Sequence, residues 1–430
     1  MSEFEAIEIQ PCGPVDASIR PPGSKSITNR ALVCAALAEG KSVLDGALDS
    51  EDTQVMIQGL RSLGLRVRHD ADARQIVLSG CNRRLPPGNA EIYVANSGTT
   101  LRFLTAIVTL GHGVFRLDGT PRMRERPVAD LLHALGALGA DVLDELGTGC
   151  PPVCVRARGL PGGRAVVSGA ISSQFLSALL MVAPCAQGPV ELVVEGELVS
   201  KPYVLMTVDV MKAFGVEVAR EGFERFLLDS SQHYAGANYA IEPDASAASY
   251  FLAAAAITGG RVTVEGLTQH AIQGDVAFCE CLARMGCDVD YTDDSITVRG
   301  GRLHGIEADM NAISDTVQTL AAVAIFAEGP TTITHVGHIR HKETDRIAAL
   351  AAELRKLGAD VDEQPDGLVI RPGPLRGVAI DTYDDHRMAM SLALAGLRIP
   401  GVRVRNPGCT AKTYPDFFED LRRVAGESPK

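Results

Sequence analysis

Several features of common protein classes are missing from this sequence of 430 residues. No uninterrupted apolar run approaches the roughly 18 residues that a membrane-spanning helix needs, and "FLSALLMVAPCAQG" is interrupted at Pro184. The amino terminus, "MSEFEAIEIQ", is acidic and has neither the basic-then-apolar order of a signal peptide nor the composition of a transit peptide. These absences predict a cytoplasmic protein without a membrane partner.

The cysteines show no zinc-binding or disulfide pattern. Ten cysteines are scattered along the chain, often inside apolar runs such as "ALVCAALA", and we interpret most of them as reduced core residues. Cys279 and Cys281 lack a partner pair at zinc spacing, and so do Cys150 and Cys154. We therefore expect no metal site.

Nucleotide-binding and hydrolase signatures are absent as well. "PPGSKS" only superficially resembles the phosphate loop G-x-x-x-x-G-K-[ST], and no G-x-G-x-x-G is followed by an acidic residue, so neither ATP nor NAD is implied. No nucleophile elbow supports Ser-His-Asp hydrolysis. A formal net charge of −12 argues against nucleic acid as a partner. We expect no cofactor. Because the chain is acidic overall, any positively charged surface must be confined to a small region.

The sequence does contain an internal repeat with a period of about seventy-two residues. Two series of glycines run in step. One series ends apolar stretches such as "LRSLGLRV" and "LRKLGADV", and the other follows alanine- or leucine-rich runs. The glycines are Gly64, Gly139, Gly215, Gly286 and Gly358 in the first series, and Gly40, Gly113, Gly188, Gly260, Gly329 and Gly401 in the second.

Six repeats fill the chain. Each is expected to form a strand, a helix, a second strand, a second helix with a left-handed glycine cap, and a strand–turn–strand. This order predicts an α/β fold with three repeats in each of two lobes. Alanine-rich first helices such as "YFLAAAAITGG" indicate helices packed inside the sheets. The alternative is six coincidental segments of an ordinary doubly wound fold.

Basic residues gather where helices are expected to begin. Ser, Asn and Asp at these starts are ordinary N-caps, but bases oppose the positive end of the helix dipole. An anion bound among several helix N-termini would offset both the dipoles and the bases. The sequence therefore predicts a strongly anionic ligand with more than one phosphate or carboxylate. The bases are Lys25, Arg30, Arg102 and Arg387 at first helices, and Arg122, Arg124, Arg126, Lys201, Lys342, Arg346 and Lys412 at second helices.

A few acids lie among these bases. They are Asp315, Glu343 and Asp384, with Asp385 beside His386. Such carboxylates are either salt-bridge partners of the bases or groups that accept and donate protons during chemistry on a bound anion. The residues alone leave both interpretations open.

Together these motifs resemble the 5-enolpyruvylshikimate-3-phosphate synthases of the enolpyruvyl transferase family. The resemblance covers essentially the whole chain, and its segments come in the family's order: "GSKSITNR", "NSGTTLRFL", "DGTPRMRERPV", "SGAISSQFLSALLM", "SKPY", "DASAASYFLAAA", "HKETDR", "DDHRMAMSLAL" and "CTAKTYPDFF". It implies two lobes of three βαβαββ repeats that close over a cleft. One lobe would comprise residues 21–238, and the other residues 1–20 and 239–430. We expect a monomer.

The resemblance also implies a reaction. The enolpyruvyl group of phosphoenolpyruvate is transferred to the 5-hydroxyl of shikimate 3-phosphate and phosphate is released, in the shikimate pathway to chorismate and the aromatic amino acids. The intermediate is tetrahedral and noncovalent, and no metal takes part. The family's pattern assigns shikimate 3-phosphate to Lys25, Ser26, Arg30, Ser172, Ser173, Gln174, Ser200, Asp315 and Lys342. It assigns phosphoenolpyruvate to Lys25, Gly98, Arg126, Gln174, Arg346, Arg387 and Lys412. Asp315 and Glu343 are the implied acid–base pair, and Lys25 is an acid or electrostatic stabiliser.

The sequence departs from the family at two positions. Phe103 follows Arg102 where the family often has proline, and His338 stands where some members have an asparagine that contacts substrate. Gly98 resembles the residue of glyphosate-sensitive members, so we expect this inhibitor to compete with phosphoenolpyruvate.

Three other functions fit parts of the pattern. UDP-N-acetylglucosamine enolpyruvyl transferase would share the architecture, but its loop carries a reactive cysteine, and "GHGVFRLDGTPRMRERP" here has none. A noncatalytic repeat scaffold that binds a polyanion would explain the bases but not the acids among them. An RNA 3′-phosphate cyclase would need a nucleotide site and a basic surface.

Overall fold

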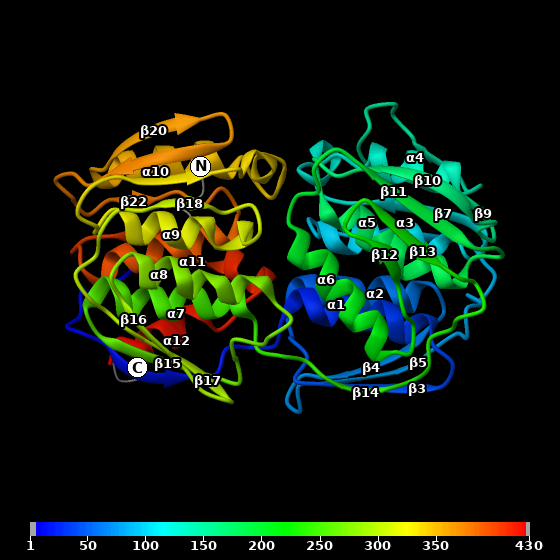
Figure 1. Cartoon of the computed structure of the whole chain (residues 1–430), viewed down its shortest axis with the longest axis horizontal. Helices are drawn as coiled ribbons and strands as arrows, with labels where there is room; N and C mark the ends of the chain where they lie inside the picture. Colours follow the sequence, from blue (N-terminus) through cyan, green and yellow to red (C-terminus); the bar gives the residue numbers. More distant parts are fainter. Residues whose placement is uncertain (1–5, 427–430) are drawn as a thin grey trace. The chain divides into compact units, whose positions relative to one another are not determined.

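A computed structural model describes residues 6–426. The chain divides into two compact lobes (Figure 1). Lobe 1 comprises Gly23–Ile241, and lobe 2 comprises the described residues up to Pro22 and those from Glu242 onward. These boundaries lie two or three residues from those that the resemblance implies. Residues 1–5 and 427–430, which the resemblance assigns to lobe 2, lie outside the described residues.

Lobe 1 contains three repeats. The first comprises α1 (Lys25–Leu37), β3 (Lys41–Asp45), α2 (Glu51–Ser62), β4 (Arg66–Asp70) and β5 (Gln75–Ser79). The second comprises β6 (Ala90–Tyr93), α3 (Gly98–Val108), β7 (His112–Asp118), the 3-10 helix η1 (Met123–Glu125), α4 (Ala129–Ala137), β8 (Asp141–Asp144) and β9 (Val153–Arg158). The third comprises β10 (Gly163–Ser168), α5 (Ser173–Val182), η2 (Ala183–Cys185), β11 (Val190–Glu195), α6 (Lys201–Ala213), β12 (Ala219–Glu221) and β13 (Arg225–Leu228), and β14 (Asn238–Ala240) follows.

Lobe 2 contains the other three repeats. The fourth comprises α7 (Ala245–Thr258), β15 (Arg261–Glu265), η3 (Gly274–Ala277), α8 (Phe278–Arg284), β16 (Asp288–Tyr291) and β17 (Ser295–Arg299). The fifth comprises β18 (Glu307–Asp309), η4 (Ser314–Thr316), α9 (Val317–Ala324), β19 (Thr331–Thr334), η5 (Gly337–His341), α10 (Arg346–Leu357), β20 (Asp360–Gln364) and β21 (Gly367–Arg371). The sixth comprises β22 (Ala379–Ile380), α11 (His386–Ala393), η6 (Leu394–Leu397), β23 (Arg403–Arg405), η7 (Pro407–Lys412) and α12 (Phe417–Val424). The amino-terminal segment adds β1 (Ala6–Glu8) and β2 (Asp16–Ile19).

The sheets repeat one topology. In the order β6-β7-β9-β8, for example, the first two strands are parallel and the other pairings are antiparallel. The sheets β10-β11-β13-β12 and β18-β19-β21-β20 follow the same rule. The sixth sheet is smaller, with three strands in the order β1-β23-β22. The recurring topology agrees with the repeat that the glycine spacing predicts.

Two first strands do not belong to the repeat that follows them in sequence. Strand β2 precedes α1, yet it pairs in parallel with β15 of lobe 2, where Ala17 faces Val262. Strand β14 precedes α7, yet it pairs in parallel with β3 of lobe 1, where Tyr239 faces Leu44. The expected order, in which each repeat begins with its own strand, is therefore wrong for the first and fourth repeats. Each of these strands completes a sheet of the lobe that the chain is about to leave.

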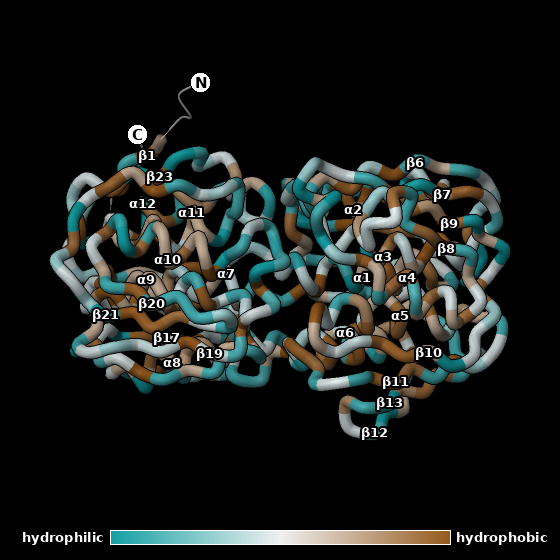
Figure 2. The backbone as a smooth tube through the Cα atoms, turned by 90° about the horizontal axis from the view of Figure 1, so that it is seen from above, coloured by the Kyte–Doolittle hydropathy of each residue, from teal (hydrophilic) through white to brown (hydrophobic). Residues whose placement is uncertain are grey.

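The first helices form the interior of each lobe. All fourteen residues of α7 and all eleven of α3 are buried. Small alanine side chains let α7 be covered on every side, and the sheets surround both helices (Figure 1). Apolar segments lie mainly in the interior helices and strands, and hydrophilic segments lie mainly in the outer loops (Figure 2). Among the described residues, none of the helices has both the length and the apolar character that crossing a membrane requires.

Polar side chains cap most of the first helices. The observed N-caps are Ser24, Ser97, Ser172, Asp244 and Asp385. Asn96 and Asp384 are polar residues that each precede one of these caps by one residue. The φ of Asp384 is 56°, so this residue is left-handed and lies outside the helix. In the fifth repeat a 3-10 turn, η4, precedes α9. The first backbone N–H groups of each helix have no partner within the helix. Several of the candidate residues lie at these helix starts.

Candidate functional site

Lys25 is the first residue of α1 in lobe 1. Its Nζ lies 3.2 Å from Oδ2 of Asp52, and both side chains are largely buried. The hydroxyl of Ser24 accepts from the backbone N–H of Ile27 at the start of the same helix. A base at this position opposes the helix dipole, and the Asp52 carboxylate offsets part of that cost.

Arg30 lies on α1 and is 2% exposed. Its Nε donates to the Thr207 hydroxyl at 2.7 Å, its Nη1 to the Ser26 carbonyl at 2.9 Å and its Nη2 to the Tyr203 carbonyl at 3.2 Å. Burial lowers the pKa of Arg30 to about 10, so the guanidinium is still charged near neutral pH. A buried cation held by uncharged oxygens is well suited to pair with an anion.

Two guanidinium groups meet at Gly98, the first residue of α3. A Cβ added there would lie 2.5 Å from Arg126 Nη2 and 2.7 Å from Arg102 Nη1. Arg126 donates to the Asn96 carbonyl at 2.9 Å, and Arg102 donates to Gln174 Oε1 at 2.7 Å. Both arginines are 4% exposed. Glycine therefore allows both groups to approach the helix start, and a larger residue would displace them.

The remaining candidates of lobe 1 lie at two other helix starts. Ser172 caps α5, and its hydroxyl accepts from the N–H of Gln174 at 3.3 Å. Ser173 is buried at the first position of that helix. Ser200 precedes α6 in a left-handed conformation with φ of 54° and is buried. These residues present hydroxyl and amide groups at helix N-termini, as a phosphate site requires.

Three other bases of lobe 1 lie in more exposed ion pairs. Arg122 lies 2.7 Å from Glu125, and Arg124 lies 2.7 Å from Asp118. Lys201 lies 3.7 Å from Glu197. Of the three arginines in "RMRER", Arg126 alone is buried. Arg122, Arg124 and Lys201, which the resemblance assigns to neither substrate, therefore differ from Arg126 in their surroundings.

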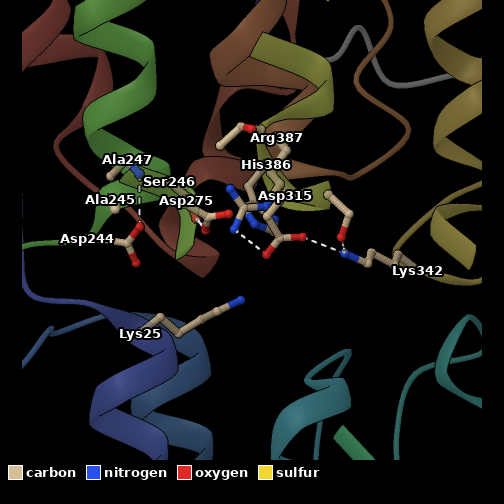
Figure 3. Close-up of polar contacts among 12 residues, drawn as sticks. Lys25, Asp244, Ala245, Ser246, Ala247, Asp275, Asp315, Lys342, His386 and Arg387 are labelled. Carbon is tan, nitrogen blue, oxygen red and sulfur yellow. Dashed lines mark hydrogen bonds and ion pairs between the residues drawn. The ribbon is translucent and has the colours of Figure 1, made fainter. Parts of the chain in front are cut away.

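In lobe 2, Asp315 accepts from three cations, and Figure 3 shows two of them, Lys342 and Arg387. Lys342 Nζ lies 2.6 Å and Arg346 Nη1 3.4 Å from Oδ1, and Arg387 Nη2 lies 2.8 Å from Oδ2. The Asp315 side chain is 16% exposed. The motifs "SDTVQT", "HKETDR" and "DDHRMAM" thus meet at one carboxylate.

Arg346 is the first residue of α10, and it pairs with three carboxylates at once, including that of Asp315. Its Nε lies 2.7 Å from Asp385 Oδ2, and its Nη2 lies 2.9 Å from Glu343 Oε2. Burial opposes the charge on Arg346, but the carboxylates of Asp385 and Glu343 raise its pKa above the ordinary value. Asp385 also accepts from the backbone N–H of Arg387 at 2.8 Å. The three cations and three carboxylates of this cluster balance in charge.

His338, Lys342 and Lys412 are the remaining candidate residues of lobe 2. Burial and the Lys342 charge lower the pKa of His338, on η5, to about 3, so its imidazole is neutral. Burial also lowers the pKa of Lys342. Lys412 is 6% exposed at the end of η7. Within residues 6–426, His, Cys, Asp and Glu form no group of three suited to a metal ion.

The structure adds two residues that the sequence did not assign to either substrate. Arg102 lies beside Arg126 at Gly98, and its place in "NSGTTLR" was the available signal. Asp385 both caps α11 and holds Arg346. The sequence shows that an acid is present at this position, but it does not show which base the acid pairs with. Because Asp315 and Glu343 are ion-paired here, the salt-bridge interpretation holds for both, and it does not preclude proton transfer.

Relatives match nearly the whole chain. The family model of EPSP synthase (3-phosphoshikimate 1-carboxyvinyltransferase) matches residues 9–421. The 3-phosphoshikimate 1-carboxyvinyltransferase of Nostoc punctiforme is 50% identical over 406 residues, which cover 94% of this chain and 95% of that protein. The chloroplastic one of Arabidopsis thaliana is 48% identical over 437 residues, which cover 97% and 84%. An EPSP synthase structure from Acinetobacter baumannii has a TM-score of 0.82 and 26% identity, and the match covers 97% of this chain and 98% of that one.

Proposed function

Because the chain belongs to the EPSP synthase (3-phosphoshikimate 1-carboxyvinyltransferase) family, we propose that it transfers the enolpyruvyl group of phosphoenolpyruvate to the 5-hydroxyl of shikimate 3-phosphate and releases phosphate. The observation that carries this proposal is the cluster of Asp315 and Glu343 with three buried or partly buried cations. A scaffold that only binds a polyanion would explain these carboxylates as salt-bridge partners, but it would not release phosphate.

Shikimate 3-phosphate is assigned chiefly to the helix starts of lobe 1. Arg30 offers a buried charge held by uncharged oxygens, and a phosphate would complete its pairing. Hydroxyl groups and the amino ends of α1 and α5 supply further donors. The proposed ligands are Lys25, Ser26, Arg30, Ser172, Ser173, Gln174 and Ser200 of lobe 1, with Asp315 and Lys342 of lobe 2.

Phosphoenolpyruvate is assigned to arginines and lysines of both lobes. Its carboxylate and phosphate suit the paired donors of a guanidinium group, which keeps its charge. Gly98 allows Arg126 to approach the start of α3, and Asp385 holds Arg346 in place. The proposed ligands are Lys25, Gly98, Arg126 and Gln174 of lobe 1, with Arg346, Arg387 and Lys412 of lobe 2.

The proposed chemistry is an addition followed by an elimination, and both steps move protons. The 5-hydroxyl loses its proton as its oxygen bonds to C2 of phosphoenolpyruvate, and C3 gains a proton to become a methyl group. The tetrahedral intermediate then loses a methyl proton and its C2–O bond to phosphate breaks. Asp315 and Glu343 are the proposed acid–base pair. Lys25 acts as an acid or stabilises the departing phosphate.

Steady-state phosphate release tests this function. We expect release only when both substrates are present, and no effect of a metal chelator on its rate. Glyphosate should inhibit competitively with phosphoenolpyruvate. Release with UDP-N-acetylglucosamine in place of shikimate 3-phosphate would show that the acceptor is wrong. Tight binding of both substrates without release would favour the noncatalytic scaffold.

A further inference from the structure

The turn from Asp381 to Asp385 in lobe 2 has an unusual backbone. Tyr383 and Asp384 both have left-handed conformations, with φ of 54° and 56°. Aspartate enters this region at small cost, but a bulky aromatic residue rarely does. Consecutive strained residues persist only where their surroundings hold them in place.

Glu353 of α10 holds this turn from one side. Its side chain is fully buried, and its carboxylate accepts from the Tyr383 hydroxyl at 2.7 Å and from the Asp381 backbone N–H at 3.1 Å. Lys356 Nζ lies 2.7 Å from Glu353 and 2.6 Å from Asp381. Burial and the bond to Glu353 raise the pKa of Tyr383 to about 12, so the hydroxyl stays a donor.

The other side of the turn faces the candidate site. Asp385 accepts from the Arg387 N–H at 2.8 Å and from Arg346 Nε at 2.7 Å. Asp384 accepts from Asn406 Nδ2 at 3.1 Å. Asn406 is itself left-handed, with φ of 50°, and precedes η7. One strained turn therefore joins α10, α11 and η7, the segments that carry Arg346, Arg387 and Lys412.

We propose that Glu353 and Tyr383 are positioning residues for phosphoenolpyruvate. Their hydrogen bond fixes the strained turn, and the turn sets the directions in which Arg346, Arg387 and Lys412 present their charges. This inference rests on the proposed function, because it takes those three residues as ligands of one substrate. It goes beyond the family's ligand pattern, since in this account neither Glu353 nor Tyr383 touches a substrate.

The test compares the effects of Tyr383→Phe on the KM for phosphoenolpyruvate and on the KM for shikimate 3-phosphate. Tyr383 is 42% exposed, so loss of its hydroxyl should leave the fold intact. We expect the KM for phosphoenolpyruvate to rise about tenfold, as for one lost hydrogen bond to a charged group. The KM for shikimate 3-phosphate and kcat should stay within about twofold. Glu353→Gln should act in the same direction, and the double variant should show a less than additive effect.

Tyr234→Phe is a control in lobe 1, at a fully buried tyrosine. This change also removes one tyrosine hydroxyl, whose hydrogen bond to the Met181 carbonyl is 2.9 Å long and lies in lobe 1. We expect both Michaelis constants of this control to be unchanged. Equal changes in both constants in Tyr383→Phe, or an unchanged KM for phosphoenolpyruvate, would overturn the positioning role. If the unmodified protein releases no phosphate, the proposed function itself fails and this inference with it.

Discussion

Asp315 Oδ2 accepts from Arg387 Nη2 at 2.8 Å, although the two residues are 72 positions apart in the sequence. The spacing equals one repeat, so equivalent helix starts of the fifth and sixth repeats meet at this ion pair. Without a ligand, the carboxylate offsets the repulsion among Arg387, Arg346 and Lys342. A bound anion would share those cations with it.

Replacing Asp315 with asparagine keeps the shape of the side chain but removes its charge. We expect Asp315→Asn to slow phosphate release by about 10²–10⁴-fold, the usual contribution of a group that transfers protons. The control is Asp118→Asn, which removes a carboxylate that pairs with Arg124 and Arg116. Similar kcat values for the two variants would contradict the role of Asp315.

Gly98→Ala should weaken binding of phosphoenolpyruvate. The new Cβ would lie 2.5 Å from Arg126 Nη2, so the guanidinium must move. We expect the KM for phosphoenolpyruvate to rise about tenfold or more, which steady-state kinetics measures. Gly136→Ala on α4 is the control, because a Cβ there meets nothing within 4 Å. Equal effects of the two changes would show that the contact with Arg126 does not matter.

Arg30→Met should separate ligand binding from stability. A buried guanidinium costs desolvation energy that a methionine does not, so we expect the ligand-free variant to lose no more than about 1 kcal/mol. Shikimate 3-phosphate at 100 times its Kd should stabilise the unmodified protein by about 2.7 kcal/mol. At the same concentration, Arg30→Met should gain less than about 1 kcal/mol. Undiminished stabilisation in calorimetry would contradict the phosphate contact.

His338 should make the protein sensitive to acid. Burial and the Lys342 charge lower its pKa from 6.5 to about 3 in the folded protein. The unfolded chain therefore binds a proton below pH 6.5 while the folded protein resists it, so this contribution to stability is complete above pH 6.5 and lost as pH falls toward 3. At pH 5 the loss is about 2 kcal/mol.

His338→Asn tests this pH dependence. Urea unfolding at pH 7.5 and pH 5 measures the free energy of unfolding of both proteins. The variant should lose less stability than the unmodified protein between these two values. Parallel losses would show that His338 titrates normally in the folded state.

Much of the fold could be predicted because its signals are local. Gly358 ends α10 in a left-handed conformation with φ of 106°, and alanine-rich α7 is buried throughout. The partners of β2 and β14 could not be predicted, because strands of three or four residues carry too little pattern to specify a partner. Their pairing depends on contacts between distant parts of the chain.

The sequence predicted which residues belong to the candidate site, but it did not predict how they are arranged. The motifs identify Asp315, Lys342 and Arg387, and the structure brings these three together. The sequence could not show that Arg124 lies in a more exposed ion pair while Arg126 is buried, because bases at alternate positions look alike. Their assignments to particular substrates stay predictions.

The most direct test of the proposed reaction is ³¹P NMR of an equimolar mixture of phosphoenolpyruvate and shikimate 3-phosphate with catalytic protein. We expect the phosphoenolpyruvate signal to be replaced by inorganic phosphate, and the shikimate 3-phosphate signal by one new monoester. Glu343→Gln should reach the same final spectrum more slowly, because a catalyst changes rates and not equilibria. Unchanged phosphorus signals with the unmodified protein, under conditions where both substrates bind, would contradict enolpyruvyl transfer.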